Sequence, residues 1–369
     1  MPPSVKRFLT PVAIVAAGLA MIGALVAVSG VVSVRASSGH WAITRWFLSF
    51  SMARSVSTDS LDVTVPETLD DPAMILRGAG HYQTGCYACH GNPTTPHPRV
   101  AAAMLPPPPY LPDVTAQWEP EELFTIVKHG VKMAGMPAWP TEARDAREDE
   151  VWAVVAFLRA FPGLSESEYR ELVWGDLEEG RAALSAAGIE RAHVQTCVRC
   201  HGVDGNGRGA GAFPLLAGQS REYLAASLRA YASGGRPSGM MEPIAAELTA
   251  AEVDALAEYF AAQTPRPSEP RSPDGQAIAR GALIAREGVP ARHVPSCIDC
   301  HGPGKAVENE EYPRLAGQPA WYLVTQLELF ASGARAGTER ANLMHEVADT
   351  LTEDQMADVA AYYAAVPAE

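Results

Sequence analysis

The chain has 369 residues, too many for a single hydrophobic core, so two or three domains are expected. Its formal net charge of −14 argues against nucleic acid as a partner, because such partners require a basic surface. Aromatic residues make up only 7% of the chain, whereas 31 glycines and 30 prolines are present. This composition favours short helices joined by long loops.

The first patterned segment along the chain is apolar. Phe8 to Val34 contains no charged residue over 27 positions, which is long enough to cross a bilayer. Lys6 and Arg7 precede this segment, so the N-terminus is expected in the cytoplasm and the rest of the chain outside it. We predict an uncleaved membrane anchor. The alternative is a signal peptide that is cleaved near Val34-Arg35-Ala36.

The next segment, residues 40–56, interleaves aromatic residues with arginines. Aromatic residues just beyond a membrane span commonly lie in the headgroup layer. An amphipathic helix on the membrane surface, or one docked on a membrane partner, fits this composition. The alternative is a short helix packed on the first folded domain. The residues concerned are Trp41, Arg45, Trp46, Phe47, Leu48, Phe50 and Arg54.

All six cysteines lie in three copies of the pattern C-x-x-C-H. This pattern is the attachment signature of c-type haem: the two thiols bind the haem covalently and the histidine binds its iron. A redox disulfide or half a zinc site would use similar cysteine pairs, but each copy carries a histidine and no cysteine remains. We therefore expect three covalently bound haem c groups. The copies are Cys86, Cys89 and His90; Cys197, Cys200 and His201; and Cys297, Cys300 and His301.

The motifs begin at residues 86, 197 and 297, at intervals that match the length of a small domain. Around the second and third motifs the sequence repeats with a constant shift of 99 residues, which indicates duplicated domains. A proline-rich spacer, 263–276, separates these two copies. The expected division is an anchor with an interfacial segment (1–57), domain one (58–165), domain two (166–264) and domain three (265–369). The repeated positions are 216–219 and 315–318, 223–224 and 322–323, 232–234 and 331–333, and Arg236 and Arg335.

Each domain is expected to open with a helix that leads into the motif and to close with an amphipathic helix. Thr249 and Thr352 are the expected N-caps of the last two closing helices. No run of alternating apolar residues indicates a sheet, so the predicted fold class is all-α. The opening helices are expected at 71–82, 177–187 and 275–286, and the closing helices at 148–161, 250–263 and 353–365.

With these motifs, residues from about 166 to 369 resemble the tandem dihaem class I cytochrome c family. Residues from about 66 to 162 resemble a monohaem class I cytochrome c domain. Together with the apolar N-terminal segment, the resemblance implies three tandem class I cytochrome c domains behind one N-terminal transmembrane helix. The usual two-domain form of the family lacks the third domain and the span. It also implies a glycine–aromatic contact where terminal helices cross, and a proline next to the carbonyl that orients each motif histidine. The contacts would join Gly180 to Tyr259 or Phe260, and Gly281 to Tyr362 or Tyr363; the prolines would be Pro109, Pro214 and Pro313.

A methionine that binds the iron opposite the histidine raises the reduction potential of the haem. Gly135-Met136-Pro137 resembles the ligand loop of class I cytochromes, which favours Met136 over Met133. The duplication selects Met241, rather than Met240, as the counterpart of Met344. His345 is a competing ligand without a counterpart in domain two. Five other histidines are interpreted as surface or packing residues: His81, His97, His129, His193 and His293.

The resemblance implies electron transfer, and no catalytic residue is expected. We expect a trihaem carrier, single-pass in a bacterial inner membrane with its haem domains in the periplasm, that serves a respiratory chain. Its donor would be a quinol-oxidising complex or a dehydrogenase, and its acceptor a terminal oxidase or a soluble cytochrome. The alternative is a tightly bound subunit of a periplasmic dehydrogenase or oxidase complex. A lesser alternative is a haem oxidoreductase for a small sulfur or nitrogen compound, which would need an open iron position.

Overall fold

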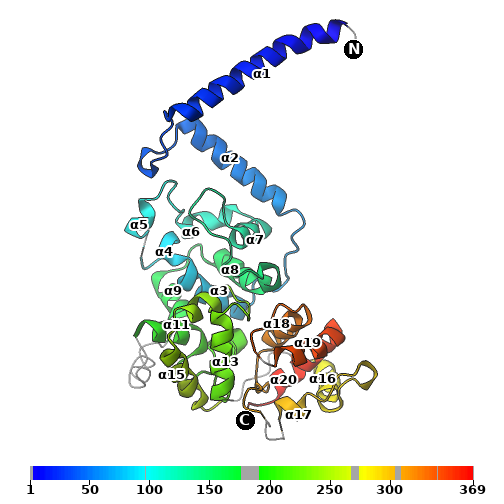
Figure 1. The fold of residues 1–369 in the computed structure, drawn as a ribbon. Helices are drawn as coiled ribbons and strands as arrows, with labels where there is room; N and C mark the ends of the chain where they lie inside the picture. The colour runs from blue at the N-terminus through cyan, green and yellow to red at the C-terminus, as the bar shows by residue number, and fades with distance from the viewer. Residues whose placement is uncertain are drawn as a thin grey trace.

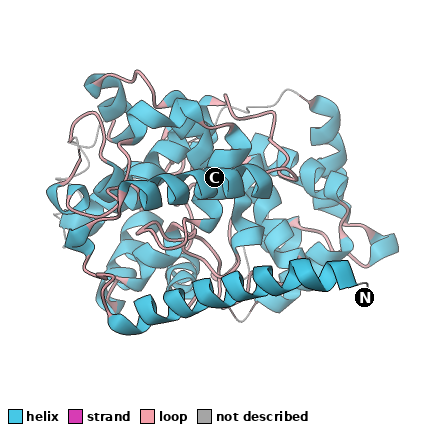
Figure 2. Ribbon diagram, turned by 90° about the horizontal axis from the view of Figure 1, so that it is seen from above, coloured by secondary structure: helices cyan, strands magenta, loops and turns pink. Residues whose placement is uncertain are grey.

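The computed structural model describes residues 3–95, 97–175, 191–266, 274–303, 309–338 and 340–368. Within these ranges the chain is helical, with two isolated β-bridges and no strand. Figure 2 shows the helices and the loops that connect them. The predicted helical fold class is confirmed for this part of the chain. The expected opening helix of domain two, 177–187, lies outside the described residues, as do Gly180 and the centre of the spacer, 267–273.

The helices follow one another along the whole chain, and Figure 1 labels most of them. In the anchor and domain one they are α1 Pro3–Ser29, α2 Ala42–Asp59, α3 Pro72–Gly85, α4 Tyr87–His90, α5 Arg99–Ala102, α6 Leu111–Val114, α7 Pro120–His129 and α8 Glu148–Ala160. They continue with α9 Glu166–Val173, α11 Arg191–His201, α12 Gly209–Ala212, α13 Arg221–Ala232, α14 Met241–Ala246 and α15 Ala250–Ala261. The last are α16 Gly275–Glu287, α17 Ile298–His301, α18 Ala320–Ala331, α19 Ala341–Thr350 and α20 Glu353–Ala365.

Helices α1 and α2 project from one end of the molecule (Figure 1). Residues Pro11–Ser29 of α1 are long and apolar enough to cross a membrane, a property that anchors and signal sequences share. Helix α1 ends at Ser29 because Gly30 adopts a left-handed conformation, with φ of 65°. The aromatic side chains of α2 are exposed, and Trp41 just before it is 79% exposed. The last turn contacts domain one: Val56 is buried there.

Two pairs of opening and closing helices cross at glycines, α3 with α8 and α16 with α20. A Cβ atom on Gly281 would overlap the backbone of α20 and meet Cβ of Tyr362, so no side chain fits there. This is one of the glycine–aromatic contacts that the resemblance implied. In domain one, Gly78 lies equally close to α8 beside Phe157. No motif in the sequence marks this second crossing.

The ends of the closing helices follow local sequence chemistry. Thr249 and Thr352 cap α15 and α20 as predicted, each accepting a hydrogen bond from the backbone three residues on. Helix α15 ends at Ala261, two residues earlier than expected. Pro265 disfavours a helical conformation at Thr264, and a turn at Ala262 and Gln263 ends the helix before that residue.

Three separate hydrophobic clusters form the cores around the three motifs. Helix α9 begins beyond the expected end of domain one at 165, yet Tyr169 is fully buried in the first cluster. Its ring contacts Phe157 and Phe161. The division into domains stays a prediction, and α9 is packed on domain one. The cluster centres include Tyr82, Phe157 and Phe161; Val253, Leu256 and Phe260; and Ile284, Val359 and Tyr363.

Replacing Gly281 with Ala should lower the thermal midpoint of unfolding, because the added methyl group overlaps the backbone of α20. Overpacking of this kind costs about 1–3 kcal/mol. Gly275→Ala, at the start of the same helix, is the matched control, since a Cβ atom there meets nothing within 4 Å. Circular dichroism melts of both variants test the prediction. Equal midpoints for the two variants would contradict the close crossing.

Candidate haem sites

Each C-x-x-C-H motif forms one helical turn. In domain one the backbone N–H of His90 donates to the carbonyl of Cys86 at 3.0 Å, and in domain three His301 donates to Cys297 at 2.9 Å. In domain two the motif is the end of α11. Residues three apart lie on one face of a helical turn, so the two thiols of each motif face the same side.

The imidazole of each motif histidine is oriented by a proline carbonyl. Nδ1 donates to this carbonyl, which leaves the lone pair of Nε2 free to bind a metal. Burial lowers the pKa of each histidine, against the opposing effect of the carbonyl, so the ring stays neutral as an iron ligand requires. The carbonyl belongs to the proline itself rather than to its neighbour. The pairs are His90 and Pro109 at 2.9 Å, His201 and Pro214 at 3.0 Å, and His301 and Pro313 at 2.8 Å.

Four of the six motif thiols lie in surroundings that disfavour the thiolate form. Burial raises the pKa of the Cys86 and Cys197 thiols to about 12, and of Cys200 and Cys297 to about 11. Reactive cysteines use thiolates, which a raised pKa disfavours. No group of three or more His, Cys, Asp or Glu side chains that could hold a metal ion occurs in the described part of the chain.

The candidate iron ligands Met136 and Met344 are less exposed than the residues that compete with them for this role. Met133 is 95% exposed, whereas Met136 is half-buried. Met344 packs against the cluster around Phe330. His345, the competing residue, is exposed and its Nδ1 donates to the carbonyl of Phe330 at 2.6 Å.

In domain two the structure separates Met240 from Met241. The side chain of Met240 is buried in the first hydrophobic cluster, which belongs to domain one. Its methyl group lies near Gly85, the residue before Cys86. Met241 is half-buried and begins α14 within domain two. Met240 therefore fills the contact between domains, and Met241 remains within its own domain.

Domains two and three face one another through matched glutamines. Gln318 bonds the backbone of Leu215, accepting from N at 3.0 Å and donating to O at 2.8 Å. Gln219 bonds the backbone of Arg314 with the same two distances. The two glutamines are 99 residues apart, so the contact has an approximate two-fold symmetry. Leu215 and Arg314 directly follow the prolines that orient the histidines, which places both candidate sites at this interface.

Two buried arginines, also 99 residues apart, lie at the same interface. Arg236 donates to the hydroxyl of Tyr322 at 2.6 Å, while its Nε is buried and has no hydrogen-bond partner among the described residues. Against the effect of burial, Arg236 and Arg335 lower the pKa of Tyr223 to about 7, so the surroundings are cationic. An unpartnered guanidinium donor in such surroundings suits an anionic carboxylate. The carboxylates of a haem have this chemistry, and these residues fit the group.

Three comparisons place the chain among known proteins. The family model of the cbb3-type cytochrome c oxidase subunit III matches residues 73–158 and 185–260, and the cytochrome c family model matches 278–366. The thiosulfate dehydrogenase electron acceptor of Thiomonas intermedia is 40% identical over 172 residues, which cover 47% of this chain and 79% of that protein. The chain belongs to the cytochrome c family.

Cytochrome c4 of Pseudomonas aeruginosa is 32% identical over 179 residues, which cover 48% of this chain and 86% of that protein. The solved structure of Acidithiobacillus ferrooxidans cytochrome c4 is 36% identical, covers 46% of this chain and 98% of that one, and gives a TM-score of 0.40. The family models and the sequence relatives identify the chain as a multihaem class I cytochrome. Its cofactor is covalently bound haem c, its function is electron transfer, and its partners are redox proteins.

Replacing Gln318 with Ala should weaken the contact between domains two and three, because it leaves buried backbone groups of Leu215 without partners. An unpaired buried group costs about 1–3 kcal/mol. The thermal midpoint should therefore fall. Gln263→Ala serves as the control. It removes a hydrogen bond from the Gln263 side chain to the carbonyl of Tyr259, at the end of α15 and inside domain two. A midpoint for Gln318→Ala no lower than that of the control would contradict the interface.

Proposed function

We propose that this chain is a membrane-anchored trihaem cytochrome that carries electrons on the periplasmic side of a bacterial inner membrane. The observation that carries the proposal is one arrangement present three times. Each motif forms a helical turn, each histidine donates to a proline carbonyl, and each domain has a half-buried methionine in a later segment. One haem in each domain accounts for all three copies.

The chain's own residues have distinct roles in this proposal. The cysteine pairs hold the haem covalently, and the histidines present Nε2 to the iron from a fixed orientation. The methionine sulfur would be the second protein ligand of the iron, which would favour the reduced state. The bound haem supplies one-electron redox chemistry. The cysteines are Cys86, Cys89, Cys197, Cys200, Cys297 and Cys300; the iron ligands are His90, Met136, His201, Met241, His301 and Met344.

The domain division is part of the proposal. Each domain is a separate class I cytochrome c unit with its own hydrophobic cluster. Because α9 is buried against α3, we place the boundary between domains one and two after Val173 rather than after residue 165. Domain three begins in the proline-rich spacer, as the sequence predicts.

The donor we propose is a periplasmic dehydrogenase, and the electrons proceed toward a terminal oxidase. Two relatives named thiosulfate dehydrogenase electron acceptor support a dehydrogenase as donor. The negative charge of the chain favours partners with basic docking surfaces. The second candidate is a permanently bound subunit of such a dehydrogenase, and the exposed aromatic side chains of α2 favour it as a docking surface.

The membrane attachment is proposed to use both N-terminal helices. Helix α1 crosses the bilayer, and α2 lies in the headgroup layer. Ile43, Trp46, Phe47 and Phe50 are spaced at i, i+3, i+4 and i+7 of α2 and are all exposed, so they form one apolar face. No acidic residue occurs before Asp59, which suits contact with anionic headgroups.

Replacing Met136, Met241 or Met344 with Ala should each lower the reduction potential of one haem and let its ferrous iron bind carbon monoxide. The expected shift is on the order of 0.1 V, within the range of about 0.8 V that axial ligands span. Redox titrations and carbon monoxide difference spectra measure both effects. Met133→Ala changes an exposed side chain and is the control. Three variants that all fail to bind carbon monoxide would contradict the ligand assignment.

The full-length protein should remain in the membrane fraction after salt and alkaline washes and require detergent for extraction. Its N-terminus should retain the residues of α1, since the span is an anchor in this proposal. Fractionation followed by N-terminal sequencing is the measurement. A soluble periplasmic protein that begins near Ala36 would instead identify a cleaved signal peptide.

A further inference from the structure

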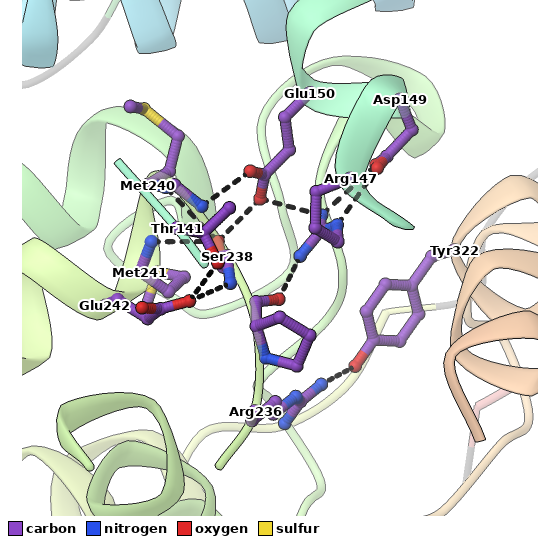
Figure 3. Close-up of polar contacts among 12 residues, drawn as sticks. Thr141, Arg147, Asp149, Glu150, Arg236, Ser238, Met240, Met241, Glu242 and Tyr322 are labelled. Atoms are coloured by element: carbon purple, nitrogen blue, oxygen red, sulfur yellow. Dashed lines mark hydrogen bonds and ion pairs between the residues drawn. The ribbon is translucent and has the colours of Figure 1, made fainter. Parts of the chain in front are cut away.

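Glu150, in the first turn of α8, lies where domain one meets the methionine loop of domain two, residues 237–242 (Figure 3). Its carboxylate is 4% exposed and both oxygens are engaged. Oε1 accepts from the Ser238 hydroxyl at 2.5 Å and pairs with Arg147 at 2.7 Å. Oε2 accepts from the backbone N–H of Gly239 at 2.7 Å and from the Trp139 indole at 2.9 Å. Four donors surround one buried carboxylate.

The methionine loop is held from domain one at both ends as well. Arg147 donates to the carbonyl of Pro237 at 2.5 Å. Thr141 donates to the carboxylate of Glu242 at 2.6 Å, which also accepts from the backbone N–H of Ser238 at 2.7 Å. The anchored positions bracket Met241 on both sides.

A short hydrogen-bonded chain connects Glu150 to Met241. The Ser238 hydroxyl donates to Glu150 and accepts from the backbone N–H of Met241 at 2.9 Å. Packing restrains the loop further, because a Cβ atom on Gly239 would overlap the Trp139 ring. The Met240 side chain is buried in domain one and cannot exchange places with Met241 without leaving that core.

The other closing helices use the residue at this position differently. Glu252 in α15 and Gln355 in α20 occupy the same third helical position, and their side chains bond to their own N-caps, Thr249 and Thr352. Helix α8 has no side-chain hydrogen bond at its N-cap. Glu150 is directed to domain two instead.

The duplication provides a second contrast. The residue 99 positions after Ser238 is Gly337, which has no hydroxyl group. The interval from the first cysteine to the methionine is 44 residues in domain two and 47 in domain three, so the loop of domain two is also the shorter one. The sequence of domain two differs from its copy where domain one contacts it.

We propose that Glu150, together with Arg147, is a positioning residue for the axial methionine of the second haem. Domain one thereby determines how Met241 is presented to the iron of domain two, and the reduction potential of the second haem depends on domain one. This inference rests on the proposed function, in which Met241 binds that iron.

The test compares detergent-extracted, full-length variants by their ferric methionine–iron charge-transfer absorption, carbon monoxide binding and redox titration. Glu150→Gln replaces one carboxylate oxygen with an NH₂ group that faces donors. It should reduce the charge-transfer absorption, open one of the three haems to carbon monoxide and shift that haem's potential alone. Ser238→Ala should affect the same haem without removing a charge. Met241→Ala identifies which haem that is.

Glu148→Gln is the matched control: it makes the same chemical change in the same turn of α8, at a residue that pairs with Lys128 inside domain one. It should leave all three haems unchanged. If Glu150→Gln fails to fold, Ser238→Ala decides the question alone. Folded Glu150→Gln or Ser238→Ala protein with three unaltered haems would overturn the inference while the ligand assignment stands. If Met241→Ala leaves the methionine–iron charge-transfer absorption of the parent protein unchanged, the ligand assignment is wrong. This inference is then wrong as well.

Discussion

The hydrogen bond between each motif histidine and a proline carbonyl is the interaction on which the rest of the structure depends. It fixes the imidazole in the orientation and tautomer that present Nε2, and it requires the proline segment to lie beside the motif. In domains two and three the same segment continues into Leu215 and Arg314, whose backbones bond the facing glutamines. Orientation of the ligand and packing of the domains therefore share one stretch of chain.

Domain one contacts the pair formed by domains two and three. These contacts do not follow the approximate two-fold symmetry of that pair. Gly80 of α3 lies beside Cys200 of the second motif. A Cβ atom at residue 80 would lie 3.1 Å from Sγ of Cys200, so a larger residue would have to displace that sulfur. The guanidinium of Arg77 stacks 3.7 Å from the ring centre of Trp321 in domain three. The counterpart of Trp321 in domain two, 99 residues earlier, is Glu222. The two copies have thus diverged where domain one contacts them.

The sequence predicted features that depend on local chemistry. The C-x-x-C-H motifs, the threonine caps and the crossing at Gly281 each follow from residues close together or from a repeated pattern. Contacts between distant residues were not predictable in this way. Glu150 reads as an ordinary first-turn acidic residue, because its partner Ser238 lies 88 positions away. Tyr169 likewise follows a proline-glycine turn that suggests a boundary, and only its burial shows where α9 belongs. The repeat favours Met241 over Met240 as a ligand, and that choice stays a prediction; what the sequence did not indicate is the burial of Met240 in domain one.

One membrane-anchored chain that carries three haems is the core of the proposed function. The intact mass of the protein, extracted from membranes with detergent, tests this most directly, because thioether bonds keep the haem on the chain during denaturation. We expect the mass of the chain with α1 retained plus three haem groups. A mass that corresponds to two haems or fewer would contradict it.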